Sequence, residues 1–281
     1  MRDAKPDFIP SKPFAYEGRV HLQIDEKYVG DASSSKKKRY MTATIFTGEM
    51  IVLIGGRKIR KKLLNRTIVS SFDISLLAKK INQALIDLYG ITADDTIWLS
   101  GDLANYIRNF PERITCCTAI YVPDKWHVCK FLSEGTDKTI GSHDVKRYLD
   151  HLLETGDISN LTDEGMKVMN LYMKNREIFK PWRDKRYLGC CQEGMNSHYY
   201  APRFGKYANR FNESTLEKLA SIKEAKENGW KTILSSKSRR PRESNLIPLG
   251  KEYPETMKFD IDTSEMKYES RKYFDTVRYG D

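Results

Sequence analysis

Residues 21–29, HLQIDEKYV, decide how the rest of the chain is interpreted. Polar and apolar side chains alternate over residues 19–24, which is the period of a half-buried β-strand. Asp25 follows this run directly, and Glu26 comes next. The sequence therefore predicts a strand with a carboxylate at its carboxyl end.

The neighbouring sequence predicts two more strands and then alternating helices and strands. The expected strands are residues 19–24, 40–46, 50–54, 96–99 and 118–122, with a loop at 30–39 and a turn at 47–49. The expected helices are residues 73–89, 103–110 and 125–132. Asp73 fits a helix cap, Gly90 a helix stop, and Pro111 the end of the second helix.

Three strands joined by short loops, followed by two strands that each lead into a helix, are typical of an RNase H-like α/β fold with a mixed sheet. Helical periodicity without a strand signal predicts a helical insertion at about 140–185. A later helix is expected at 214–228, where Ser214 and Glu217 fit a capping box. The expected domains are an irregular leader (1–17), an RNase H-like catalytic domain with the insertion (18–230), and a basic linker with a charged C-terminal tail (231–281).

Composition narrows the class of partner. The chain has 281 residues and a formal net charge of +10, and such an excess of positive charge favours a polyanion such as DNA. No run of about 18 apolar residues is present in the sequence, so no membrane partner is expected. The five cysteines have neither a zinc spacing nor a disulfide pattern, and a cytoplasmic location is the default expectation.

Three acidic residues stand where metal-dependent phosphodiester chemistry would need them. Asp25 follows the first strand, Asp102 follows the fourth, and Glu193 lies near the start of an expected helix. Two Mg²⁺ or Mn²⁺ ions held by carboxylates neutralise charge on the attacking and leaving oxygens of a phosphodiester. Asp25, Asp102 and Glu193 are therefore the candidate catalytic residues and metal ligands, with Asp25 bridging both ions.

A structural interpretation of each residue stays open at this point. An Asp after a strand is commonly a turn former or a helix cap, and a Glu in the first turn of a helix suits the helix dipole. The three residues together, on the expected elements, carry more weight than any one alone.

Three segments give the chain a resemblance to the ISLre-type insertion-sequence transposases and their relatives in integrative elements. They are residues 21–29; residues 97–102 (IWLSGD) together with 121–127 (YVPDKWH); and residues 190–198 (CCQEGMNSH), followed by Arg203 and a helix ending near Trp230. The likeness covers about residues 19–230. It departs from the family pattern where Leu103 replaces a Gly and Trp126 replaces a Phe.

The resemblance implies a DNA transposase that uses an acidic triad in an RNase H-like domain. Carried over by position, the triad is again Asp25, Asp102 and Glu193. The family's activity is cleavage at element ends followed by strand transfer, and a homo-oligomer on DNA is expected because two ends must be brought together. Members of the family tend to have a sizeable region ahead of the first catalytic strand, so a truncated copy, a degenerate relative and a chain without its DNA-end recognition domain all stay open.

Further residues are candidates for contact with substrate or with the metal ligands. Asp124 and His127 flank the fifth strand and could orient substrate or a metal-bound water, although an ordinary polar pair explains them equally well. Ser197 and His198 follow Glu193 and face the same choice between function and packing.

Basic residues interleaved with aromatics suggest a DNA surface. Arg203 and Lys206 lie in such a stretch, at 199–210, and could bind phosphates while the aromatics stack on unpaired bases. The basic run 36–39 could also contact phosphates. A solvated amphipathic surface remains the structural alternative for both.

Two other functions remain open. One is an RNase H-like nuclease that hydrolyses DNA without joining strands. The other is a non-catalytic DNA-binding relative of a transposase, whose binding would depend strongly on salt.

Overall fold

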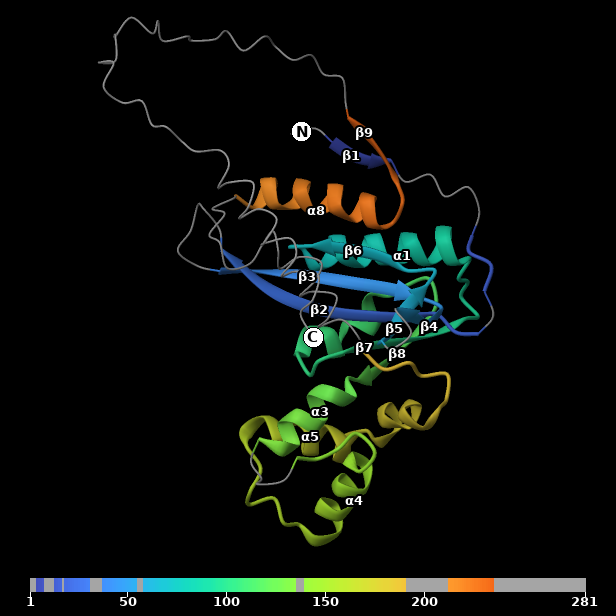
Figure 1. The fold of residues 1–281 in the computed structure, drawn as a ribbon. Coiled ribbons are helices and arrows are strands. Elements are labelled where there is room, and N and C mark those ends of the chain that lie inside the picture. The colour runs from blue at the N-terminus through green and yellow to red at the C-terminus, as the bar shows by residue number, and fades with distance from the viewer. Residues whose placement is uncertain are drawn as a thin grey trace, which may run out of the picture. The chain divides into compact units, whose positions relative to one another are not determined.

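The computed structural model has a mixed α/β fold built around a five-stranded sheet (Figure 1). It describes residues 4–7, 13–16, 18–30, 37–54, 58–134, 139–190 and 212–234. The sheet order is β6-β3-β2-β7-β8. Its strands are β2 (His21–Gly30), β3 (Lys37–Phe46), β6 (Thr67–Ser71), β7 (Thr96–Gly101) and β8 (Thr118–Pro123).

Strand direction divides the sheet into two parts. β3 runs antiparallel to both β2 and β6, whereas β2, β7 and β8 run parallel to one another. The carboxyl ends of β7 and β8 therefore lie side by side, next to the middle of β2. β2 runs on to Gly30, so the predicted end of this strand at Ile24 is wrong.

The third strand of the sheet differs from the prediction. Residues 50–54 belong to β4 (Gly48–Ile54), which pairs with β5 (Lys58–Leu64) in a separate two-stranded sheet. β6 takes the predicted place instead and pairs with β3. The apolar run at 50–54 had the stronger local signal, but pairing partners are decided by contacts between distant residues.

The predicted helix after the third strand is confirmed as α1 (Ile74–Tyr89). The Asp73 side chain accepts a hydrogen bond from the backbone N–H of Leu76, and Gly90 ends the helix with a φ of 63°. The apolar face of α1, including Leu77, packs on the sheet residues in the main core. β7 follows and leads into the short helix α2 (Asn105–Arg108) and the 3₁₀ helix η1 (Phe110–Arg113).

Pro111 lies in the first turn of the 3₁₀ helix η1, and α2 already ends at Arg108, two residues before the predicted end at Phe110. The fixed φ of proline suits the first turn of a helix, where its missing N–H has no partner to lose.

Helices fill the stretch between β8 and residue 183. They are α3 (Lys125–Ser133), α4 (Val145–Thr155), α5 (Asp163–Lys174) and the 3₁₀ helix η2 (Arg176–Arg183). Buried side chains of α3, α4 and α5 belong to the same hydrophobic core as those of the sheet and α1. In the described residues, no helix has both the length and the apolarity to cross a membrane.

The last described helix is α8 (Glu213–Glu227). Its N-cap is Asn212, whose side chain accepts from the N–H of Thr215, so the predicted capping role of Ser214 is wrong. α8 lies beside β6 (Figure 1), and its Leu216 and Ala220 share a second core with Ile68. β9 (Lys231–Leu234) follows and pairs with β1 (Ala4–Asp7), so part of the stretch interpreted as an irregular leader is a strand.

Candidate active site on β2 and at the carboxyl ends of β7 and β8

The register of the three parallel strands aligns side chains in rows across the sheet. Gln23 in β2 pairs with Ser100 in β7, and Ser100 pairs with Val122 in β8. Side chains alternate between the two faces of a strand, so residues two positions further on each strand lie in the next row on the same face. The next row begins where β7 and β8 end.

That next row consists of three aspartates. Asp25, Asp102 and Asp124 each stand two residues after the members of the preceding row. The structure therefore brings together Asp25 and Asp102, which the sequence singled out as catalytic candidates, and adds Asp124 beside them. Asp25 and Asp102 are half-buried, and Asp124 is buried with 5% of its surface exposed.

Each of the three carboxylates accepts a hydrogen bond from a backbone N–H close to it in sequence. Asp25 Oδ1 accepts from Glu26 at 2.7 Å, and Asp102 Oδ1 accepts from Ala104 at 2.9 Å. Asp124 is the N-cap of α3, and its Oδ1 accepts from the backbone N–H two residues on at 3.2 Å. These local bonds turn the carboxylates toward their own strand ends.

The second oxygen of Asp124 lies 2.5 Å from Nδ1 of His127, one turn further along α3. Burial by itself lowers the pKa of His127, but the hydrogen bond and charge of Asp124 outweigh it. The charges of Asp102 and Asp25 act in the same direction, and the pKa of His127 is raised above its ordinary value. The charges of all three members of the aspartate row therefore act on the pKa of the His127 imidazole.

A fourth acid, Glu26, and Tyr106 of α2 complete the polar cluster, although no sequence pattern pointed to either. Burial, followed by the charge of Glu26, raises the pKa of Tyr106, and Asp102 and Asp25 raise it further. Arg39 of β3 lies over the Tyr106 ring at 4.3 Å and is 3.6 Å from Glu26 Oε2. The Glu26 Oε2 atom and the Tyr106 hydroxyl are both buried without a hydrogen-bond partner among the described residues.

Gly101 sets how closely the elements approach at the aspartate row. A Cβ atom on Gly101 would lie 2.6 Å from Cγ2 of Ile107 and 2.7 Å from the carbonyl oxygen of Ile24. Such contacts are too short for any side chain. Glycine immediately before Asp102 is thus required by the packing of β2 and α2 around the end of β7.

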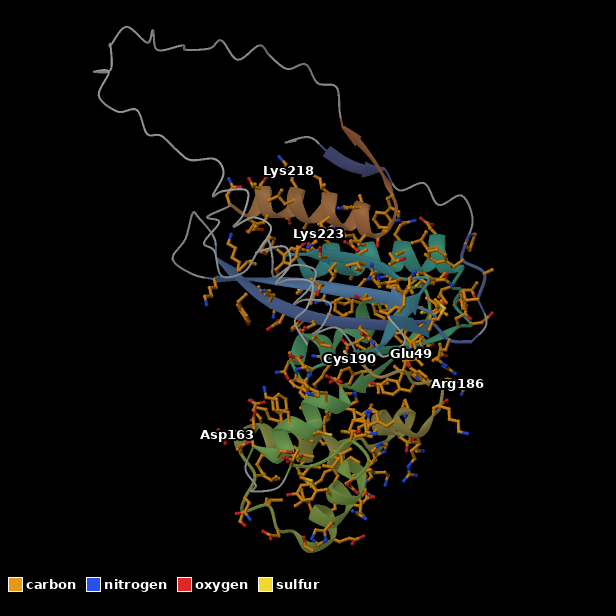
Figure 2. All side chains as sticks on the ribbon, viewed as in Figure 1. Glu49, Asp163, Arg186, Cys190, Lys218 and Lys223 are labelled. Atoms are coloured by element: carbon orange, nitrogen blue, oxygen red, sulfur yellow. The ribbon has the colours of Figure 1, made fainter. Side chains whose placement is uncertain are left out.

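The segment after η2 crosses the same face of the sheet, one row before the aspartates. Tyr187 lies with its hydroxyl 3.2 Å from the hydroxyl of Ser100, and the Gln23 amide donates to the carbonyl of Gly189 at 2.7 Å. Figure 2 labels Cys190, the last described residue of this segment.

The other predicted site residues lie outside the described residues. They are Glu193, Ser197, His198, Arg203 and Lys206. The structure therefore leaves their predicted roles as predictions.

The donor atoms of the aspartate row suit a hard divalent cation in their chemistry, since all are carboxylate oxygens. Their arrangement is not a finished metal site. Within the described residues, no three His, Cys, Asp or Glu side chains come together as a group that could hold a metal ion.

The chain matches no protein-family model, and no curated protein is similar to it in sequence. The geometry of the aspartate row therefore carries the functional argument.

Proposed function

We propose that this chain is a metal-dependent enzyme that cleaves phosphodiester bonds in DNA, and that it acts as a transposase on an RNase H-like domain. The observation that carries the proposal is the row formed by Asp25 within β2, Asp102 directly after β7 and Asp124 directly after β8, on three adjacent parallel strands. Three antiparallel strands followed by two parallel strands with intervening helices is the order expected of an RNase H-like sheet.

The proposed roles follow from position. Asp25 and Asp102 would hold Mg²⁺ or Mn²⁺, with Glu193 as the expected third ligand. Support for Glu193 comes from Gln23, in the row before Asp25, because its side chain hydrogen-bonds to Gly189, four residues before Glu193 in sequence. The bound ions would neutralise charge on the attacking and leaving oxygens. Asp124 is a positioning residue, because it fixes the ring of His127 beside the row.

DNA is the proposed partner because a basic surface adjoins the row. The β2–β3 ribbon (residues 26–30 and 37–41) continues β2 past Asp25. It carries Lys27, Lys37, Lys38 and Arg39 on its described strands, of which Lys38 pairs with Glu213 of α8. Lys and Arg side chains bind phosphate without regard to base sequence. The run predicted to be a loop at 30–39 is thus partly strand, and its basic residues 37–39 pair with residues 28–30 of β2, three to five residues past Asp25.

Nicking of supercoiled plasmid tests the catalytic proposal. The parent chain should nick in Mg²⁺ or Mn²⁺, and not in EDTA. Asp25→Asn and Asp102→Asn should each reduce nicking to the background rate, because an amide cannot supply the charge of a carboxylate to the metal. Glu193→Gln tests the third ligand in the same assay.

The matched control is Asp94→Asn, which makes the same change in an exposed turn ahead of β7, at the opposite end of that strand. It should nick like the parent. If the parent folds and binds DNA but never nicks, the catalytic proposal fails and a non-catalytic DNA-binding protein replaces it. If it nicks but cannot join a 3′-hydroxyl end to a target, a hydrolytic nuclease replaces the transposase.

A further inference from the structure

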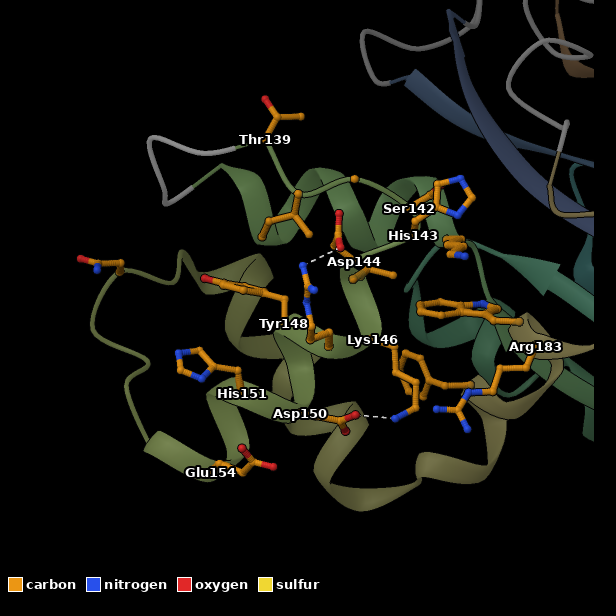
Figure 3. Close-up of a pocket in the computed structure, with 18 residues that line it drawn as sticks. Thr139, Ser142, His143, Asp144, Lys146, Tyr148, Asp150, His151, Glu154 and Arg183 are labelled. Atoms are coloured by element: carbon orange, nitrogen blue, oxygen red, sulfur yellow. Dashed lines mark hydrogen bonds and ion pairs between the residues drawn. The ribbon is translucent and has the colours of Figure 1, made fainter.

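Two neighbouring hollows lie on the side of α3, and the first of them adjoins the aspartate row. The first is lined by Asp124 itself and by Trp126, Lys130 and Cys190, among others. The second is lined by α4, η2 and the segment before α4, including His143, Lys146 and Arg183 (Figure 3). Lys125 and the segment 139–142 line both hollows, so the two form neighbouring parts of one surface.

Trp126 is the unusual residue of the first hollow. Half of its surface is exposed, although a side chain of this size normally gains from burial. Its backbone N–H donates to Asp124, so this second residue of α3 is held next to the aspartate row. The ammonium of Lys130 lies 5.4 Å from the centroid of the indole.

The second hollow contains basic side chains, and only some of them form ion pairs. Lys146 and Arg147 are paired with Asp150 and Asp144, as Figure 3 shows. By contrast, neither Lys125 nor Arg183 forms an ion pair with any described residue. Lys125 and Arg183 are therefore the basic side chains best placed to bind a phosphate.

The second hollow is also held close to the aspartate row. Lys125 lies 5.7 Å from the ring centroid of Trp182, and the Trp182 indole N–H donates to the carbonyl of Pro123 at 2.9 Å. Since Pro123 directly precedes Asp124, these contacts hold the basic side chains of the second hollow next to the aspartate row.

We propose that this surface binds an unpaired stretch of DNA that leads to the aspartate row. Trp126 stacks on one base, and Lys125 and Arg183 bind the phosphates of the same strand. Sites that bind single strands combine an exposed aromatic ring with nearby basic side chains. Stacking requires a nucleobase whose face is not covered by its neighbours in a duplex. The inference rests on the proposed function, because the row supplies the reason for a strand to be held there.

Fluorescence anisotropy in EDTA tests the proposal without any cleavage. A labelled 20-nucleotide oligo-dT should bind the parent more tightly than a 20-base-pair duplex. Trp126→Ala should weaken binding of oligo-dT by roughly tenfold, and Trp126→Phe should restore most of the affinity. The control Met173→Ala removes an apolar side chain of similar exposure from α5 and should change nothing.

An abasic 20-mer with the same phosphates separates stacking from charge. The parent should bind the abasic 20-mer about as weakly as the Trp126→Ala variant binds oligo-dT. Trp126→Ala should not weaken binding of the abasic 20-mer further, because both changes remove the same stacking interaction. Arg183→Ala should lower the affinity for both oligomers and reduce the slope of log affinity against log salt by about one. Arg113→Ala, on exposed η1, is the charge-matched control.

The proposal is overturned if Trp126→Ala binds oligo-dT like the parent, if the duplex binds more tightly, or if oligo-rU binds more tightly than oligo-dT. These results are independent of nicking. Loss of nicking with intact strand binding would remove the proposed catalysis and leave this surface. Normal nicking with no effect of Trp126→Ala would remove the inference alone.

Discussion

At the scale of single residues, several side chains in the candidate site already have a structural task. Asp124 caps α3 and pairs with His127, and Gly101 leaves room for Ile24 and Ile107. These tasks do not exclude function, because a side chain held by a cap or by close packing is held in a reproducible position. His21 lies two rows before the aspartates, and its burial there disfavours the charged form of its imidazole.

His21 should make the protein less stable in mild acid. Burial lowers the pKa of His21 to about 4, and Arg19 adds to the effect while Asp184 opposes it. In the unfolded chain the imidazole binds a proton near pH 6.5, whereas in the folded chain it does not until about pH 4. The free energy of unfolding should therefore fall as pH falls from 6.5 to 4, by about 3 kcal/mol at most from this group.

Urea denaturation at several pH values measures this slope. His21→Phe keeps a ring against Phe46 and Trp98 but cannot bind a proton, so its stability should fall less than that of the parent over this range. His151→Phe, on the exposed surface of α4, should keep the parent's slope. Equal slopes for the parent and His21→Phe would contradict the prediction.

At the scale of elements, the docking of α8 beside β6 depends on polar contacts as well as on its small apolar core. β6 is an edge strand, so the outward N–H and C=O groups of Ile68 have no neighbouring strand among the described residues. The side chain of Asn228 takes that place, because its Oδ1 accepts from the N–H at 2.9 Å and its Nδ2 donates to the C=O at 2.8 Å. Nearby, buried Glu224 accepts hydrogen bonds from Ser70 and Lys80.

Asn228→Ala should lower the free energy of unfolding by about 1–3 kcal/mol, because it leaves two backbone groups of Ile68 without partners. It should also speed hydrogen exchange of the Ile68 amide. Asn160→Ala, at an exposed position, is the control and should stay within about 0.5 kcal/mol of the parent. A change of that small size for Asn228→Ala would show that water replaces the amide without cost.

At the scale of the whole described structure, one hydrophobic core joins the sheet to the helices α3, α4 and α5. Leu22 of β2 and Leu99 of β7 belong to the same cluster of buried residues as Leu149 of α4 and Val168 of α5. Elements that share a core lose their packing together when it opens. The sheet and the helical region should therefore unfold as one unit.

Leu149→Ala tests this coupling. Leu149 is fully buried, so its truncation should cost about 2–5 kcal/mol. Hydrogen exchange of the slowest amides in β2 and in α4 should accelerate by the same free energy. The control Leu76→Ala makes the same change at an exposed position of α1 and should leave both rates almost unchanged. Faster exchange in α4 alone would mean that the helices open independently of the sheet.

Features that depend on near neighbours could be predicted from the sequence. The cap at Asp73 and the stop at Gly90 were predictable because capping involves residues within one helical turn. The position of Asp102 directly after a strand was also predictable, and Asp25 was indicated as a candidate although β2 does not stop before it but runs on to Gly30. Local sequence is therefore sufficient to indicate two of the three carboxylates in the candidate site.

Strand pairing and register, by contrast, were set by the tertiary structure alone. β6 entered the sheet in preference to the more apolar residues 50–54, and the register set Asp124 in the same row as Asp25 and Asp102. The tertiary structure also brought Glu26 and Tyr106 together from separate elements. Pairing and register depend on contacts between residues far apart in the chain, and no local pattern of residues encodes those contacts.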